Sequence, residues 1–475
     1  MHPSFEPFIL SPLDHVISKI VLKSYLSFHC NDPSQAAAVL QAGIADLVSH
    51  LPFVAGCMSS TTLPNGKQNA TLVSPPTAAF LEHVPMVVVK HHNQCLTPDN
   101  ATPDCPLVDY EAMNGDTTFF RAVDPPAVNI MVRWQINVLK DGIILGSSFH
   151  HQFVDGKALV QLHETLGAFC RRASGEKNVI ISTGVRIQEA ARRQIEQNTT
   201  SSNVDLDGAY ASRPMMPLPR ELLANAVSEK LYFSSSKVKE LKNRFNSLLS
   251  RDPTKAKLSS NDVVTALIWL CACRARLQAL PAEQRQQAAS NGSVIMTVAD
   301  VRSMMSPPLP DTYIANAIAM TTCSHSLNLA QKGNLDAHQQ DLSDLFQIAL
   351  QVQKGLRKIT PDYVRGLITQ QLNSDNWGSF RFRYAELMVS NMRYMPFVGI
   401  DFGSVLGKSK VYDMPKNPFD GICWVLPAPC DARGLSMTEE PWRIRLTLQR
   451  EAMKELLQDR LYQWISTEKP IQAKL

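Results

Sequence analysis

The sequence lacks any apolar run long enough to cross a bilayer, and it carries little charge. Its longest apolar stretches, such as residues 266–273, are far shorter than the roughly 20 residues that a membrane-spanning helix needs. Charged residues make up 19% of the 475 positions, and the net charge of +4 is spread along the chain. We therefore expect no nucleic-acid partner and no membrane span. The start has no basic segment followed by an apolar core, so we expect no secretory signal.

Several motifs of well-known enzyme classes are also absent. The chain has no dinucleotide fingerprint, no phosphate-binding P-loop and no Gly-x-Ser-x-Gly nucleophile elbow. It contains Asp401-Phe402-Gly403, but without the glycine-rich loop and the catalytic loop of a protein kinase. The ten cysteines are expected to be free thiols in a reducing compartment. The spacing of His91, His92, Cys95 and Cys105 fits no ordinary structural zinc site, so we predict no metal.

The most informative stretch contains two adjacent histidines at the junction between a predicted strand and a predicted helix. Residues 130–138 alternate apolar and polar side chains, which predicts a half-buried strand. Residues 140–142 predict a turn, and residues 143–149 the second strand of a hairpin. Apolar residues then recur at helical spacing from position 159. His151 therefore leaves the end of a strand, and Asp155 and Gly156 precede a helix.

This position suits a general base. The imidazole of His151 has an ordinary pKa close to neutral pH, so it can take up and return a proton. Asp155 could accept hydrogen bonds in the loop or pair with a distant cation, and Gly156 would allow a tight turn. The alternative is structural, with histidines at a strand end and Asp155 as the helix N-cap. These residues alone leave both interpretations open.

A resemblance to a known family favours catalysis. Residues 151–156 match the HxxxDG motif of the BAHD-type, coenzyme A-dependent acyltransferases. Residues 10–14, Leu-Ser-Pro-Leu-Asp, resemble the opening of its fungal branch, which includes the trichothecene O-acetyltransferases. Residues 259–276 and 298–316 are similar to two further segments of the family, "S.ND..TA..W...AR" and "VD.R....PP.P..Y.GN". Residues 401–405 correspond to its DFGWG motif, but Ser and Val replace the last two residues.

The resemblance implies an α/β fold of the two-domain chloramphenicol-acetyltransferase type. Each domain would contain a mixed sheet with helices, and the active-site channel would run between the domains. We expect an N-terminal domain over residues 1–182, which carries HxxxDG, and a crossover over residues 183–222, where polar and proline-rich segments lie. A C-terminal domain with the DFG motif would follow over residues 223–475.

The resemblance also assigns roles to residues. His151 would be the catalytic base, and Arg302 would pair with Asp155 and so fix the direction of His151. Such a pair is reasonable, because a buried carboxylate needs a partner and arginine can grip it with two hydrogen bonds. Gly156, Asp401 and Gly403 would support the site structurally. Ser259 and Ser260 would lie on the coenzyme side, although helix capping is an alternative role for them.

The implied activity is transfer of an acyl group, acetyl by expectation, from acyl-CoA to a hydroxyl of a secondary metabolite. Acyl-CoA would be a co-substrate, with no permanently bound cofactor, and the protein would act as a monomer. Two alternatives stay open: a non-catalytic relative that binds a ligand, and a use of the same base to acylate an amine or form a carbon–carbon bond. We expect a cytoplasmic protein, or a peroxisomal one if Ala473-Lys474-Leu475 is read as an address. A peroxisomal location would make longer acyl chains plausible.

Overall fold

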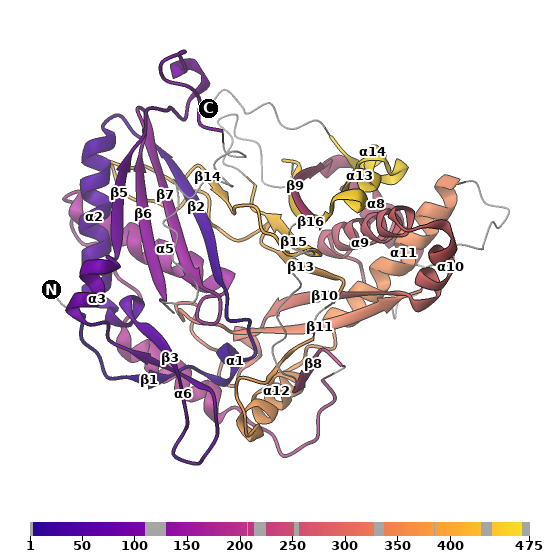
Figure 1. Ribbon diagram of the computed structural model, residues 1–475, viewed down its shortest axis with the longest axis horizontal. Coiled ribbons are helices and arrows are strands. Elements are labelled where there is room, and N and C mark those ends of the chain that lie inside the picture. The colour runs from indigo at the N-terminus through magenta and orange to yellow at the C-terminus, as the bar shows by residue number, and fades with distance from the viewer. Residues whose placement is uncertain are drawn as a thin grey trace.

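The computed structural model contains two large mixed sheets that stand side by side, each with its own helices (Figure 1). It describes residues 3–109, 130–206, 208–212, 225–250, 256–326, 337–383, 385–428 and 439–467. The terminal Ala473-Lys474-Leu475 and Cys430 lie outside these ranges, and the nine cysteines within them are free thiols, as predicted. No helix in the described ranges is long and apolar enough to span a bilayer.

The first large sheet has five strands and carries the His151 motif at one strand end. Its strand order is β14 (Val411–Asp413), β2 (Val21–His29), β7 (Gly142–His150), β6 (Val132–Val138), β5 (Val87–His91). Only the β5–β6 pair is parallel among these. Helices α2 (Pro33–His50) and α5 (Gly156–Ala173) pack against each other beside this sheet (Figure 1). Asp32 is the N-cap of α2, since its carboxylate accepts a hydrogen bond from the Gln35 N–H.

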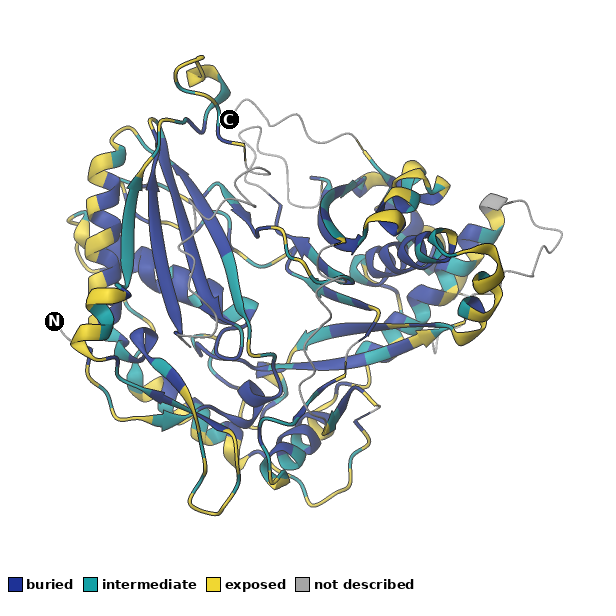
Figure 2. Cartoon of the chain, in the orientation of Figure 1, coloured by how far each residue is buried: buried dark blue, intermediate teal, exposed yellow. Residues whose placement is uncertain are grey.

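The β6–β7 hairpin is present, but the expectation of a half-buried strand is wrong. All seven residues of β6 are buried, including the polar ones. The whole strand is accordingly dark blue in Figure 2. The polar side chains have partners inside the protein: Gln135 Nε2 donates to Asn137 Oδ1 at 2.7 Å, and Asn137 Nδ2 donates to the Ile144 carbonyl at 3.0 Å. Burial of these polar groups is tolerated because they are hydrogen-bonded.

The second large sheet has six strands. Its order is β11 (Ile318–His325), β10 (Ser293–Asp300), β13 (Leu387–Asn391), β15 (Ile422–Leu426), β16 (Trp442–Gln449), β9 (Ala226–Phe233). The central pairs β10–β13 and β13–β15 are parallel and the others antiparallel. The buried helix α9 (Ser260–Ala279) packs among α8 (Ser235–Leu249), α11 (Ala337–Leu356) and α13 (Arg450–Gln458). Two mixed sheets with helices confirm the predicted α/β class.

The remaining elements are short. Small sheets form from β1 (Phe8–Ile9), β4 (Ala70–Ser74) and β3 (Cys57–Thr61), and from β12 (Phe380–Phe382) and β8 (Tyr210–Ser212). The other helical elements are α1 (Pro12–His15), η1 (Pro52–Ala55), α3 (Ala78–His83), η2 (Pro98–Asn100), α6 (Val185–Gln197), α10 (Ala282–Asn291), η3 (Arg302–Met304), α12 (Pro361–Asn373) and α14 (Arg460–Ile465). Ser234 is the N-cap of α8, and its hydroxyl accepts a hydrogen bond from the Lys237 N–H.

The two sheets are linked by a strand that comes late in the sequence. β14 pairs with β2 in the first sheet, although its neighbours in sequence, β13 and β15, belong to the second. Asp413 of β14 forms ion pairs with Lys230 of β9 and, at 3.0 Å, with Arg443 of β16. The chain from 223 onward thus completes the first sheet as well as forming the second. The boundaries 1–182, 183–222 and 223–475 stay predictions.

Candidate active site

The site is built on the short loop between β7 and α5. The backbone N–H groups of Phe153 and Val154 both donate to the His150 carbonyl, at 2.9 and 3.1 Å, and the His151 N–H donates to the Ile20 carbonyl at 2.8 Å. His150 and Gln152 are buried, whereas His151 between them is partly exposed. Of the two adjacent histidines, His151 is therefore the one that the loop leaves partly exposed to solvent.

The imidazole of His151 is oriented by its own loop. Its Nδ1 lies 3.1 Å from the Val154 carbonyl oxygen, and a carbonyl only accepts, so Nδ1 carries the proton and Nε2 keeps a free electron pair. No group of the described ranges forms a hydrogen bond to Nε2. Burial lowers the pKa of His151 below 6.5, against the Val154 hydrogen bond and the Asp155 charge, which raise it. The ring is neutral at pH 7, as a general base must be.

His150 is poorly suited to this role. Its side chain is 3% exposed, and its Nδ1 accepts a hydrogen bond from the Gln152 N–H at 3.3 Å. Burial, followed by the charges of His151 and Lys19, lowers the pKa of His150 to about 4. His150 is thus a buried neutral residue of the strand.

Asp155 holds the loop through three partners. Its carboxylate accepts hydrogen bonds from the Ala158 N–H and the Ala317 N–H, both at 2.8 Å, and from Arg302 Nη2 at 3.0 Å. The side chains of Asp155 and Arg302 are each 1% exposed. The expected ion pair is therefore present, and Asp155 is also the N-cap of α5. Asp155 is therefore both the helix cap and the partner of Arg302, so the two predicted roles are compatible.

Arg302 continues this network toward the surface. Its Nη2 donates to the Ala315 carbonyl at 2.7 Å and its Nη1 to Asp300 Oδ1 at 2.9 Å. Asp300 in turn pairs with Lys157 at 3.4 Å, and Lys157 with Asp311 at 2.6 Å. Arg302, at the buried end of this series of ion pairs, fixes the loop through Asp155. At the other end, Lys157 is partly exposed and Asp311 is exposed to solvent.

Gly156 does not have the positive φ of a tight turn, so the reason first expected for a glycine here is wrong. It is the first residue of α5. A Cβ at this position would lie 2.9 Å from the Met395 sulfur. The glycine therefore permits close packing of the helix start against Met395.

A second support of the loop was not anticipated from the sequence. Asn316 Nδ2 donates to the His151 carbonyl at 3.0 Å and to Asp14 Oδ1 at 3.1 Å. Burial raises the pKa of Asp14 to about 7, against its hydrogen bonds to Ser11 and Asn316. The spacing Ser11-x-x-Asp14 is that of a capping box and could have identified the start of α1, but nothing local points from Asp14 to His151.

Ser259 and Ser260 lie at the start of α9. Ser259 is the N-cap in a capping box, in which its hydroxyl donates to Asp262 Oδ2 at 2.8 Å and accepts from the Asp262 N–H at 3.2 Å. Ser260 is the first helical residue, and its hydroxyl forms no hydrogen bond within the described ranges. The helix-capping role of Ser259 is thus seen directly, and a coenzyme contact of either residue stays a prediction.

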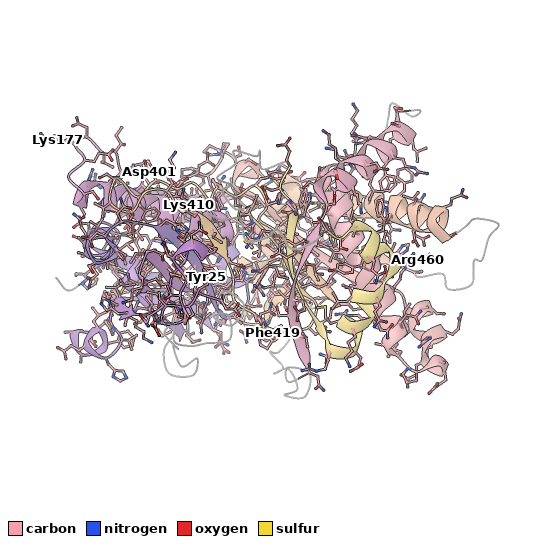
Figure 3. The ribbon with its side chains drawn as sticks, turned by 90° about the horizontal axis from the view of Figure 1, so that it is seen from above. Tyr25, Lys177, Asp401, Lys410, Phe419 and Arg460 are labelled. Atoms are coloured by element: carbon pink, nitrogen blue, oxygen red, sulfur yellow. The ribbon has the colours of Figure 1, made fainter. Side chains whose placement is uncertain are left out.

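Asp401 and Gly403 form a turn against the far end of α5. Asp401 Oδ1 accepts from the Gly403 N–H at 2.9 Å, and its carbonyl accepts from Arg171 Nη1 at 2.8 Å. Arg171 comes 15 residues after Gly156, or roughly 22 Å along a helix. Figure 3 shows Asp401 on the same side of the molecule as Lys177, which follows α5. The turn thus supports α5 at a distance from His151.

The cysteine and histidine group near residue 95 has ordinary partners. His92 Nε2 lies 2.9 Å from Asn137 Oδ1, and Cys95 Sγ donates to the Thr97 carbonyl at 3.4 Å. Within the described ranges, no cluster of three or more histidine, cysteine or acidic side chains has the arrangement of a metal site.

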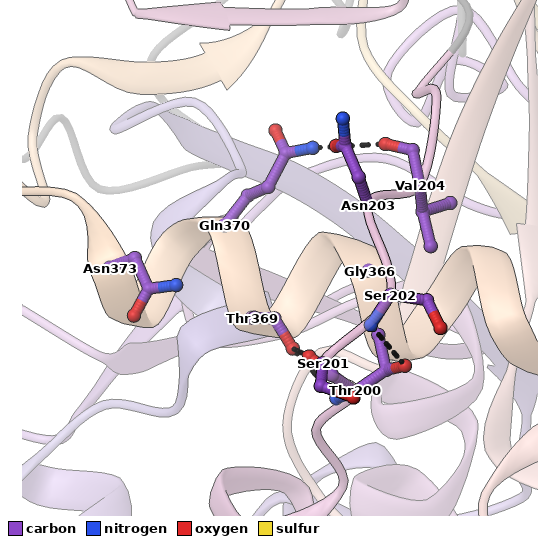
Figure 4. A pocket seen from close by; sticks show the side chains of 9 residues that line it. All are labelled: Thr200, Ser201, Ser202, Asn203, Val204, Gly366, Thr369, Gln370 and Asn373. Atoms are coloured by element: carbon purple, nitrogen blue, oxygen red, sulfur yellow. Dashed lines mark hydrogen bonds between the residues drawn. The ribbon is translucent and has the colours of Figure 1, made fainter.

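Two cavities lie away from the loop. One, of 280 Å³, is lined by residues 200–204 and α12. The α12 side chains bond to the backbone of that segment: Gln370 Nε2 donates to the Val204 carbonyl at 3.1 Å, and Thr369 Oγ1 accepts from the Thr200 N–H at 3.0 Å (Figure 4). The other, of 350 Å³, lies between α5, residues 180–182 and residues 399–401. Neither is lined by His151, so the channel between the domains stays a prediction.

Comparison with known proteins matches the Transferase family model to residues 108–461. The chain is 28% identical to the Communesin N16 acyltransferase cnsK of Penicillium expansum, covering 97% of this chain and 98% of that protein. It is 27% identical to the O-acetyltransferase cpsE of Aspergillus campestris, covering 96% and 95%.

Solved structures with this fold include the TRI101 protein of F. sporotrichioides complexed with coenzyme A and T-2 (TM-score 0.72, 19% identity, 98% and 99% coverage). Vinorine synthase also matches, with a TM-score of 0.64 at 15% identity over 98% of this chain and 95% of that one. These likenesses establish the fold.

Proposed function

We propose, from the premise that this chain belongs to the Transferase family of BAHD-type acyltransferases, that it transfers an acyl group from acyl-CoA to a hydroxyl of a small secondary metabolite, with His151 as general base. The observation that carries this proposal is the state of the His151 ring. Nδ1 is bound to the Val154 carbonyl, and Nε2 has no partner among the described residues. The ring therefore has one nitrogen fixed in direction and the other available for a proton.

The proposed reaction has two steps. Nε2 takes the proton of the acceptor hydroxyl as the oxygen attacks the thioester carbonyl and forms a tetrahedral intermediate. The carbon–sulfur bond then breaks, and the imidazolium returns the proton to the coenzyme A thiolate. A positioned base contributes about 10²–10⁴-fold, and holding both substrates together contributes further. Asp155 takes no part in proton transfer, since Arg302, Ala158 and Ala317 occupy its carboxylate.

The names of the relatives support small secondary metabolites as acceptors. They include the O-acetyltransferase cpsE and the Fumigaclavine B O-acetyltransferase easN of Aspergillus fumigatus. We therefore propose an acetyl group as the group transferred and acyl-CoA as co-substrate. We further propose that the enzyme acts as a monomer without a bound cofactor. A cytoplasmic location, or a peroxisomal one if residues 473–475 act as an address, is part of the same proposal.

A second function is acylation of an amine. The relative cnsK is named as an N16 acyltransferase, so its acceptor atom is nitrogen. The same base could remove a proton from the nitrogen after attack on the thioester. The identity of the acceptor atom separates the two functions.

The test is acyl transfer by the purified chain. A panel of short and long acyl-CoA thioesters is offered with alcohol and amine acceptors, thiol release is followed, and products are identified by mass spectrometry. We expect His151→Ala to lose at least 100-fold in turnover, in line with the contribution of a base, while circular dichroism stays unchanged. His91→Ala, at an exposed histidine of β5, is the matched control and should retain full turnover. Near-normal turnover by His151→Ala would refute the mechanism, and acyl-CoA binding without turnover would indicate a non-catalytic relative.

A further inference from the structure

We propose that Asn316, anchored by Asp14, is a positioning residue that fixes the peptide carbonyl of His151 and thereby aims its imidazole. This inference rests on the proposed function, in which His151 is the base. It joins three segments that are far apart in sequence: the N-terminal segment with α1, the β7–α5 loop, and the segment between η3 and β11.

The contacts place Asn316 between the other two residues. Its side-chain Nδ2 donates to the His151 carbonyl at 3.0 Å and to Asp14 Oδ1 at 3.1 Å, and its backbone N–H donates to the same Asp14 oxygen at 3.0 Å. Asn316 is 0% exposed and Asp14 1%. Both acceptors require a donor, so the amide nitrogen must face them. Rotation of the amide by 180° would present an oxygen to two oxygens.

Asp14 is itself held firmly on its other side. Its Oδ2 accepts from the Ser11 N–H at 2.8 Å and from the Ser11 hydroxyl at 2.7 Å. Asp14 forms no ion pair within the described ranges. Its charge favours the protonated forms of Arg192 and Tyr313. A buried carboxylate without an ion-pair partner is costly to keep. Its four hydrogen bonds form a rigid anchor for Asn316.

The same segment holds both ends of the catalytic loop. Asn316 binds the carbonyl of His151, and the next residue, Ala317, donates its N–H to Asp155 Oδ2 at 2.8 Å. The His151 N–H is fixed by the Ile20 carbonyl at 2.8 Å. The peptide groups on both sides of His151 are therefore held, which sets the direction of its Cα–Cβ bond. A displacement of about 1 Å in a reacting group can reduce turnover about 100-fold.

The experiment compares Asn316→Ala with Ser11→Ala. Both remove one side-chain donor to Asp14 at a site that is 0% exposed, but only Asn316→Ala releases the His151 carbonyl. We expect Asn316→Ala to lower kcat about 10- to 100-fold with the KM for acyl-CoA unchanged. Ser11→Ala keeps the Ser11 N–H bond to Asp14 at 2.8 Å and both bonds between Asn316 and Asp14, so Asp14 stays in place. We therefore expect Ser11→Ala to lower thermal stability by about as much as Asn316→Ala, while its kcat stays within about twofold of the wild type.

Asn316→Ser covers the case in which the alanine variant does not fold, because serine keeps a donor but is too short to reach both acceptors. Its kcat should also fall with KM unchanged. Equal kcat losses in the Asn316 and Ser11 variants, in proportion to their stability, would show a structural role alone and overturn the inference. Absence of turnover in the wild type would instead refute the proposed function, so the two failures are distinct.

Discussion

The guanidinium of Arg302 and the carboxylate of Asp155 lie 147 positions apart in sequence and form a hydrogen bond of 3.0 Å in the protein interior. Asp155 is also the N-cap of α5 and a partner of the Ala317 N–H. One carboxylate therefore joins the helix start, the second half of the chain and the loop of His151. Its loss should affect folding and activity together.

Arg302→Met tests how much the ion pair between Arg302 and Asp155 contributes to the stability of the protein. The change leaves the carboxylate of Asp155 buried without its cation, which typically costs about 3–5 kcal/mol of the free energy of unfolding. Urea denaturation followed by circular dichroism measures the loss. Lys157→Met is the matched control, because it removes the same kind of charge from the partly exposed end of the network and should cost no more than about 1 kcal/mol. Equal losses in the two variants would contradict the argument.

The sequence was sufficient to predict the loop, because strand periodicity, helix periodicity and a short motif meet at residues 151–156, whereas the pairing of Asp155 with Arg302 was implied only by the resemblance to the family. The sequence was not sufficient to predict the contact between Asp14 and Asn316, because these residues are 302 positions apart and their pairing leaves no local pattern. The three-residue strand β14 could not be predicted either, because so short a segment shows no periodicity. The wrong expectation for β6 has another cause, since alternation shows which side chains are polar but not whether protein groups satisfy them.

The pH dependence of turnover should report on His151. Burial lowers its pKa below 6.5, so the neutral ring persists at neutral pH and is lost only in more acidic solution. We expect kcat/KM to be flat from about pH 7 to 8 and to fall in acid with a midpoint below 6.5. Initial rates at acceptor concentrations well below KM, measured across pH 5–8.5, would show this. A midpoint well above 6.5 would mean that another group carries the proton.

Stability should also change with pH, through buried histidines. Burial is the leading cause that lowers the pKa of His15 and His150 to about 4 and of His163 to about 3. The unfolded chain therefore binds protons first, and their contribution to stability is present above pH 6.5 and lost as pH falls toward these values. Asp14 acts in the opposite sense, because its pKa is raised to about 7 and stability rises as it is protonated.

Between pH 7.5 and 5.5 the three histidines together destabilise the fold by more than the single aspartate stabilises it. We therefore expect the free energy of unfolding to fall by about 2 kcal/mol over this range. Urea unfolding at several pH values would measure it. Asp14→Asn removes the opposing contribution and should make the decline steeper. A stability that stays constant over this range would show that these histidines gain protons without unfolding.

Gly403 should matter for stability but not for chemistry. Its φ is +91°, and a Cβ there would lie 3.1 Å from Arg171 Cα. Gly175 has nearly the same φ, +87°, but no atom within 4 Å of the added Cβ. Both Gly→Ala variants should lose about 1–3 kcal/mol through backbone strain, and Gly403→Ala should lose more because of the contact. Turnover per folded molecule should be unchanged in both, since the turn contacts the far end of α5.

The start of α9 allows a test that separates helix capping from coenzyme binding. Ser259→Ala removes the N-cap and should cost about 1 kcal/mol of unfolding free energy, with the KM for acyl-CoA little changed. The hydroxyl of Ser260 has no partner among the described residues and lies at the positive end of the helix dipole. If it binds a coenzyme phosphate, Ser260→Ala should raise the KM for acyl-CoA about tenfold, the effect of losing roughly 1.4 kcal/mol, without loss of stability. Thermal unfolding and acyl-CoA titrations of the two variants decide between the roles. An unchanged KM in Ser260→Ala would place the coenzyme elsewhere.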